Sequence, residues 1–141
     1  MRGLYADTGY LLYRLGLRSG QLFNAALQES GLRLRHYALL RYLATVEGAL
    51  QRELSARLGY DPSAIVGLVD DLEERGFVER APAPSDRRSR VVVLTEKGEA
   101  FLRDTDEASR RVTESLTAPL PAADRETLQN LLHRLARPEA T

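Results

Sequence analysis

The spacing of apolar residues predicts a long helix at the start of the chain. They recur at roughly helical intervals, at Leu12, Leu15, Leu22, Phe23, Ala26 and Leu27. The pattern stops near Gly31, where we expect the helix to end. Glycines at positions 9, 16 and 20 each cost such a helix about 1 kcal/mol relative to alanine, so we expect packing against another surface to stabilise it.

Three further helices are predicted before Gly76. Apolar positions predict one from residue 37 to about 48 and a short one over 50–58, closed by Gly59. The next has a clear start, because Asp61 can cap it and Pro62 suits a first helical position. Its apolar stripe is expected to face a core and consists of Ile65, Leu68, Val69 and Leu72.

The periodicity changes after Gly76. Residues 77–80 and 90–94 are β-type runs, and turn-forming residues fill positions 81–89 between them, which predicts a β-hairpin. Thr95 can cap a fifth helix, and Pro119 and Pro121 separate it from a final one. The predicted fold is mainly α with a small β-hairpin wing: a winged helix-turn-helix with helices added at both ends.

The flanking helices predict a homodimer. Their apolar faces are more than a winged helix of this size could cover, and a second copy of the chain is the simplest cover. We therefore expect an N-terminal dimerisation helix (1–31), a DNA-binding winged helix-turn-helix (32–98) and C-terminal dimerisation helices (99–141), interlocked as one domain.

Composition narrows the possible functions. The 141 residues suit one domain, and the formal net charge is zero, so the local distribution of charge must decide whether nucleic acid is a partner. The absence of cysteine excludes disulfides, thiolate zinc sites and thiol catalysis. Since no signal peptide or membrane-spanning run is found, we expect a cytoplasmic protein without a membrane partner.

Residues 50–76 have the pattern of a helix-turn-helix, whose second helix can enter the major groove of double-stranded DNA by its N-terminal end. The positions on this recognition helix that are not committed to the core are Pro62, Ser63, Ala64, Val66 and Gly67. A helical hairpin inside an all-α core explains this pattern equally well when it is taken alone.

The hairpin favours DNA. Residues 80–90 hold four arginines and one acid, a local charge of +3 in a neutral chain. Arginine on a loop can enter a narrow minor groove, while its neighbours hold phosphates. We predict that Arg87, Arg88 and Arg90 bind DNA. A solvated loop is the usual explanation of one charged segment, but a basic hairpin directly after a helix-turn-helix is much rarer.

The sequence from about Tyr37 to Leu102 resembles the MarR family of regulators. The matching segments are Leu54, 56–59, 68–76 (LVDDLEERG), 77–80 (FVER), 86–88 (DRR) and 94–98 (LTEKG). The resemblance implies triangular homodimers whose first and last helices interlock, with two winged helices on a palindromic operator. It also implies that Asp86 pairs with Arg88 to stiffen the wing, and that many members repress transcription until an anionic aromatic ligand binds.

The recognition helix departs from the family pattern. Between Asp61 and Glu74 it has five acids and no lysine or arginine, so the usual bidentate arginine–guanine contact is missing. Either Ser63 and apolar contacts with thymine methyl groups select the bases, or affinity rests on the wing and backbone amides. The alternative function is a winged-helix dimer without DNA binding that serves as a protein-interaction or small-molecule-binding module.

No enzyme, cofactor or metal site is predicted. His36 and His133 are far apart in the sequence, and the acids at 70, 71, 73 and 74 are typical of a solvated helix face. For a small-molecule effector, aromatic and basic residues on the first two helices are the candidates: Tyr10, Tyr13, Arg14, Arg18, His36 and Tyr37, with Arg33 beside them. His36 could instead be a structural hydrogen-bonding residue, and Tyr10 and Tyr13 could belong to a dimer interface.

Overall fold

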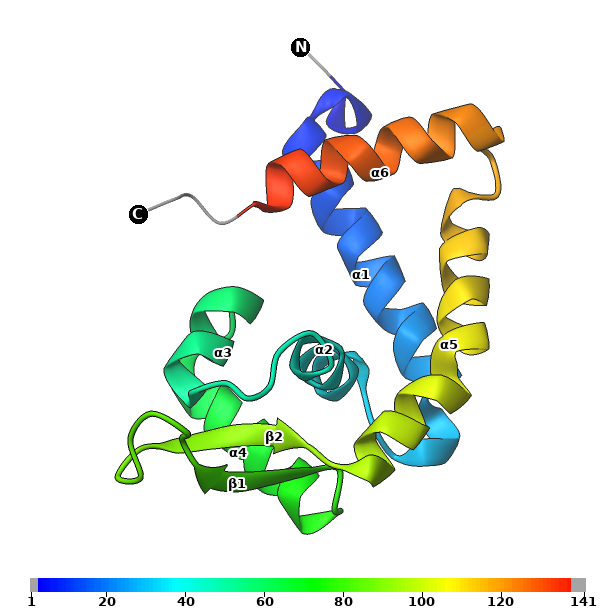
Figure 1. The fold of residues 1–141 in the computed structure, drawn as a ribbon. Helices are drawn as coiled ribbons and strands as arrows, with labels where there is room; N and C mark the ends of the chain where they lie inside the picture. The colour runs from blue at the N-terminus through cyan, green and yellow to red at the C-terminus, as the bar shows by residue number, and fades with distance from the viewer. Residues whose placement is uncertain (1–2, 138–141) are drawn as a thin grey trace.

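A computed structural model describes residues 3–137 and contains the predicted series of helices around one hairpin (Figure 1). The helices are α1 (Thr8–Ala26), α2 (Leu34–Leu43), α3 (Gln51–Leu58), α4 (Pro62–Glu74), α5 (Glu96–Thr117) and α6 (Ala122–Ala136), with short 3-10 turns at Leu4–Ala6 and Gln28–Ser30. The strands are β1 (Val78–Pro82) and β2 (Arg90–Leu94). The predicted fold class is therefore confirmed.

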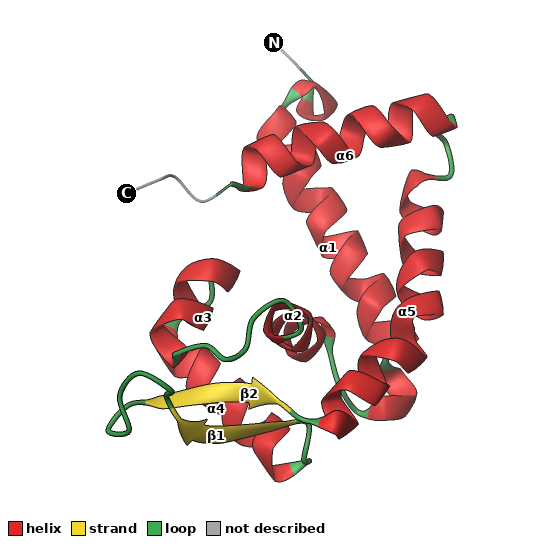
Figure 2. Cartoon of the chain, in the orientation of Figure 1, coloured by secondary structure: helices red, strands yellow, loops and turns green. Residues whose placement is uncertain are grey.

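The hairpin is the one sheet of the described residues (Figure 2). Its strands are antiparallel, and Val78 pairs with Leu94 at one end while Pro82 pairs with Arg90 at the other. Ala49, which precedes α3, adds an isolated bridge to Val92. This bridge fixes the hairpin against the helix-turn-helix, because the two backbones exchange hydrogen bonds of 3.0 and 2.8 Å.

The core of the winged helix is formed by the predicted apolar stripes. Leu40, Leu54, Ile65, Val69 and Leu72 are completely buried. Burying one such side chain is worth about 1.5–3 kcal/mol, so this core explains why α2, α3 and α4 pack together.

The helix ends follow local sequence rules, with one exception. Gly31 and Gly59 adopt left-handed φ angles of 72° and 69°, as expected at the ends of helical segments. The Thr95 hydroxyl caps α5 by accepting a hydrogen bond from the Gly98 N–H. Asp61, in contrast, makes no side-chain hydrogen bond to α4, so the cap predicted there is wrong and the start of α4 rests on Pro62.

The flanking helices extend away from the winged helix. α5 lies beside α1, and α6 turns back from the end of α5 (Figure 1). Large apolar side chains on these elements remain exposed in the single chain: Leu4, Tyr5, Leu12, Tyr13, Leu15 and Leu17 near the N-terminus, and Leu131, Leu132 and Leu135 on α6. Among the described residues, no helix has the length and hydropathy needed to cross a membrane.

Candidate nucleic-acid interface

The first two turns of α4 are exposed where the sequence predicts DNA contact. Pro62, Ser63, Val66 and Gly67 are exposed, and Ala64 is half-buried. Val66, at 40% exposure, is the large apolar side chain of this surface. These positions are sterically free to contact bases, and their role there stays a prediction.

The other half of α4 is acidic, and Arg80 of β1 neutralises much of it. Its guanidinium lies 2.6 Å from an Asp70 carboxylate oxygen and 2.8 Å from one of Glu73. It also donates to the side-chain oxygen of Gln51 at the start of α3, at 2.9 and 3.2 Å. The backbone N–H of Arg80 donates to Glu73, and this bond, reinforced by the ion pair, lowers the pKa of the Glu73 carboxyl.

This network corrects the local charge expected from the sequence. The value of +3 over residues 80–90 counted Arg80, whose charge is in fact balanced by Asp70 and Glu73. Arg80 joins α3, α4 and β1 and is only 23% exposed. The charge available to a ligand therefore belongs to the remaining arginines of the hairpin.

Asp86 shapes the tip of the wing through backbone contacts. One carboxylate oxygen accepts from the Arg88 backbone N–H at 3.0 Å, and the other accepts from the Ser89 hydroxyl at 3.3 Å. Asp86 therefore contacts Arg88 as the resemblance implies, through the Arg88 backbone N–H and, among the described residues, without an ion pair to its guanidinium; the wing-stiffening role itself stays a prediction.

Three arginines of the hairpin are exposed. Within the part of the chain that the structure describes, the side chains of Arg87 and Arg88 make no hydrogen bond or ion pair, and Arg90 donates one hydrogen bond of 3.2 Å to the Arg80 carbonyl oxygen. Exposed guanidinium groups on a loop held by Asp86 can bind phosphates or enter a minor groove.

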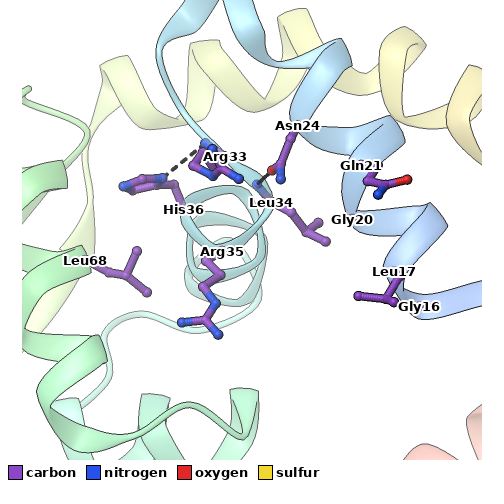
Figure 3. Close-up of a pocket in the computed structure, with 10 residues that line it drawn as sticks. All are labelled: Gly16, Leu17, Gly20, Gln21, Asn24, Arg33, Leu34, Arg35, His36 and Leu68. Carbon is purple, nitrogen blue, oxygen red and sulfur yellow. Dashed lines mark hydrogen bonds between the residues drawn. The ribbon is translucent and has the colours of Figure 1, made fainter. Parts of the chain in front are cut away.

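A cavity of about 510 Å³ lies between α1, the start of α2 and α4. Figure 3 shows its lining: Gly16, Leu17, Gly20, Gln21, Asn24, Arg33, Leu34, Arg35, His36 and Leu68. Two arginines give its wall positive charge, and Leu68 belongs to the recognition helix itself. The volume suits a small organic ligand.

Of the seven residues considered for an effector, Arg33 and His36 line this cavity and the other five do not. Arg14 instead donates to the Tyr5 hydroxyl at 3.1 Å, and Tyr10 packs edge-on against Tyr5 near the start of α1. Tyr13 and Arg18 are exposed on α1.

Tyr37 is a core residue, packed against Phe23 with ring centroids 5.6 Å apart.

The effector residues expected from the sequence do not include Arg35, Gln21 or Asn24, which also line the cavity. Gln21 and Asn24 share a face of α1 with Leu17, but that spacing does not say which element the face meets.

No group of three or more metal-ligating side chains comes together within residues 3–137. His36 is hydrogen-bonded to Asp71, and His133 is exposed on α6. Asp71 also accepts from Arg75 at 3.0 Å, so the acids of α4 are largely paired with basic or polar groups.

Known proteins of similar structure are transcriptional regulators. The MarR family model matches residues 30–89. A MarR-family transcriptional regulator from Rhodococcus sp. RHA1 is 34% identical with a TM-score of 0.90, covering 98% of this chain and 99% of that one. CouR from Rhodococcus jostii RHA1, solved bound to p-coumaroyl-CoA, is 36% identical with a TM-score of 0.87, covering 100% and 99%.

Curated relatives give the same result. The HTH-type transcriptional repressor Rv2887 of Mycobacterium tuberculosis (strain ATCC 25618 / H37Rv) is 31% identical over 130 residues, which are 92% of this chain and 94% of that protein. A putative transcriptional regulatory protein for the hcr operon of Thauera aromatica is 35% identical over 104 residues, 74% of this chain and 63% of that protein.

Proposed function

Because this chain belongs to the MarR family of transcriptional regulators, we propose that it is a sequence-specific DNA-binding repressor of palindromic operators. The observation that carries the proposal is the exposed pair Arg87 and Arg88 on a wing attached to a complete helix-turn-helix. Residues 62–64, 66 and 67 contact the major groove, while Arg87, Arg88 and Arg90 bind phosphates or the minor groove. The protein acts on DNA in the cytoplasm, and we assign it no catalysis.

The functional unit is a homodimer. Leu135 on α6 is 71% exposed in the single chain, and Leu12 and Leu15 on α1 are 45% and 50% exposed. Exposing several large apolar side chains to water is costly, and a second copy of the chain would bury them. Residues 1–31 and 99–141 would supply this interface, and residues 32–98 would supply the DNA-binding region.

A small ligand in the cavity relieves repression. The cavity borders both the flanking helix α1 and the recognition helix α4, so an occupant contacts both parts of the protein. Arg33 and Arg35 favour an anion, and Leu17 and Leu34 provide apolar contacts for an aromatic group. CouR, which is similar over the whole chain, was solved with p-coumaroyl-CoA bound.

The wing provides the test of DNA binding. The parent and the double variant Arg87→Ala/Arg88→Ala are titrated with the DNA upstream of the protein's own gene at several salt concentrations. We expect weaker binding and a salt slope that falls by about one for each phosphate that the wing no longer neutralises. The matched control is Arg110→Ala/Arg111→Ala on α5, which removes the same charge far along the chain from the wing; because α5 belongs to the proposed dimer interface, sedimentation must first show that the control variant is still a dimer. Equal affinity and slope for the wing variant and the parent would remove the wing from the mechanism.

A second candidate function rests on the recognition helix without basic residues: a winged-helix dimer that binds a protein or a small molecule and no DNA. A gel shift and a nuclease footprint with the same upstream DNA separate the two functions. The proposed repressor should protect two half-sites about one helical turn apart, whereas the alternative protects none.

A further inference from the structure

His36 joins the start of α2 to the recognition helix. Its Nδ1 accepts a hydrogen bond from the Arg33 backbone N–H at 3.1 Å, and its Nε2 lies 2.7 Å from a carboxylate oxygen of Asp71 on α4. A neutral imidazole whose Nδ1 accepts carries its proton on Nε2, so Nε2 donates to Asp71. The two bonds fix both the ring and its tautomer.

Asp71 extends this connection. Its second oxygen accepts from Arg75 at the end of α4, and Arg75 donates in turn to the Gly31 carbonyl oxygen at 3.1 Å. The C-terminal half of α4 is therefore held to the segment that enters α2 at two points. The His36 side chain is 12% exposed, so water competes only weakly for its bond to Asp71.

Arg35 makes an equivalent contact at the other end of α4. Its guanidinium lies 4.9 Å from the ring centroid of Tyr60, in the turn that leads into α4. Burial raises the pKa of the Tyr60 hydroxyl, and the Arg35 charge opposes that shift. The Tyr60 carbonyl oxygen accepts from Ser55 at 2.6 Å, so the turn is anchored on α3 as well.

We propose that Arg35 and His36 are positioning residues that set the recognition helix relative to α2 through Tyr60 and Asp71. Both side chains also line the cavity, together with Leu68 of α4 (Figure 3). The two side chains that hold the recognition helix therefore also line the cavity. This inference rests on the proposed DNA-binding function and names the residues that hold its recognition helix in place.

Two substitutions of His36 separate its two hydrogen bonds. His36→Asn keeps an acceptor close to the position of Nδ1 but cannot reach Asp71, whereas His36→Gln places an N–H donor near the position of Nε2. Asp71→Asn leaves one acceptor oxygen for the two donors His36 and Arg75, so it cannot keep both bonds. The matched control is Glu74→Gln, which removes one acid from an exposed position of the same helix.

Two measurements are made on the full chain: affinity for the upstream DNA and hydrogen exchange of the α4 amides. His36→Asn and Asp71→Asn should each weaken DNA binding and speed α4 exchange by about three- to tenfold, the range for one hydrogen bond. The double variant should bind DNA about as tightly as whichever single variant binds it less tightly, because both substitutions break the same bond. His36→Gln and Glu74→Gln should stay within about twofold of the parent, and α5 exchange should not change.

The inference is overturned if His36→Asn behaves like His36→Gln, if the single effects multiply in the double variant, or if α4 exchange changes while DNA affinity does not. A parent protein that binds no DNA refutes the proposed function. In that case the exchange data alone still decide whether His36 holds α4.

Arg35 is tested by one variant that removes its charge and one that keeps it. Arg35→Gln should weaken DNA binding about two- to fivefold, the range for an exposed cation–π contact, while Arg35→Lys should retain most of the affinity. Arg33→Gln is the control, because Arg33 lines the same cavity without such a contact to Tyr60. Equal losses for Arg35→Gln and Arg33→Gln would show that Arg35 acts only through its charge.

Discussion

Arg80→Ala should destabilise the winged helix by about 1–3 kcal/mol. The substitution removes ion pairs to Asp70 and Glu73, which are worth about 0.2–1 kcal/mol each because these carboxylates are 62% and 41% exposed. It also removes the hydrogen bonds to Gln51, which together contribute about 0.5–1.5 kcal/mol. Because Arg80 joins three elements, its loss also leaves the acidic face of α4 without its main counter-charge.

Urea unfolding at pH 7 and fixed protein concentration measures the loss, first at low and then at high salt. The ion-pair part should shrink with salt while the hydrogen-bond part remains. Arg90→Ala, on the facing strand, is the matched control. Arg90 makes a single bond to a carbonyl oxygen, so its loss should cost less than about 1 kcal/mol. Equal destabilisation by the two substitutions, or no change for Arg80→Ala, would refute the network as an anchor of the wing.

Three other substitutions test packing, protonation and assembly. Gly98→Ala should destabilise the chain by about 1–3 kcal/mol in thermal melts, although alanine favours helices, because its Cβ would collide with the Phe77 carbonyl oxygen; unchanged or higher stability would contradict this. Glu73→Gln should lower stability at pH 7, but its difference from the parent should vanish in acid. The pKa of Glu73 is lowered in the folded protein, so its contribution to the free energy of unfolding is present above the ordinary value of 4.5 and is lost as pH falls through the folded-state value. Urea unfolding at a series of pH values checks this, and a difference between variant and parent that persists in acid would count against it. Leu135→Glu should shift the protein from dimer to monomer in sedimentation experiments at micromolar concentration, and an undisturbed dimer would exclude this part of α6 from the interface.

The secondary structure could be predicted because its determinants are local. Gly31, Gly59 and Gly76 have positive φ angles, which glycine adopts at little cost, and each marks an end that the sequence already indicates. Thr95 caps α5 through a group only three residues away. Asp61 shows the limit of this reasoning, since a capping residue type does not by itself make the capping bond.

The site was less predictable because its contacts join residues far apart in sequence. In the sequence Arg80 adds to the charge of the basic hairpin, but its partner Gln51 lies 29 positions away. His36 and Asp71 are 35 positions apart. Nothing local to either pair indicates that they meet, because their separation in space depends on how α2, α3 and α4 pack. The same packing decides which residues of α1 line the cavity.

Most of the acidic side chains of α4 have partners within the protein. In the sequence, the absence of lysine and arginine from the recognition helix favours a protein that has lost its DNA-binding function, while the acids lie toward the C-terminal end of that helix. In the structure Asp70 and Glu73 pair with Arg80, and Asp71 pairs with His36 and Arg75, so three of the acids hold α4 to its neighbours. Two guanidinium groups therefore offset most of the charge of these three acids before any ligand arrives. For the proposed repressor, we therefore expect the missing arginine to limit how bases are selected more than whether the helix can approach DNA.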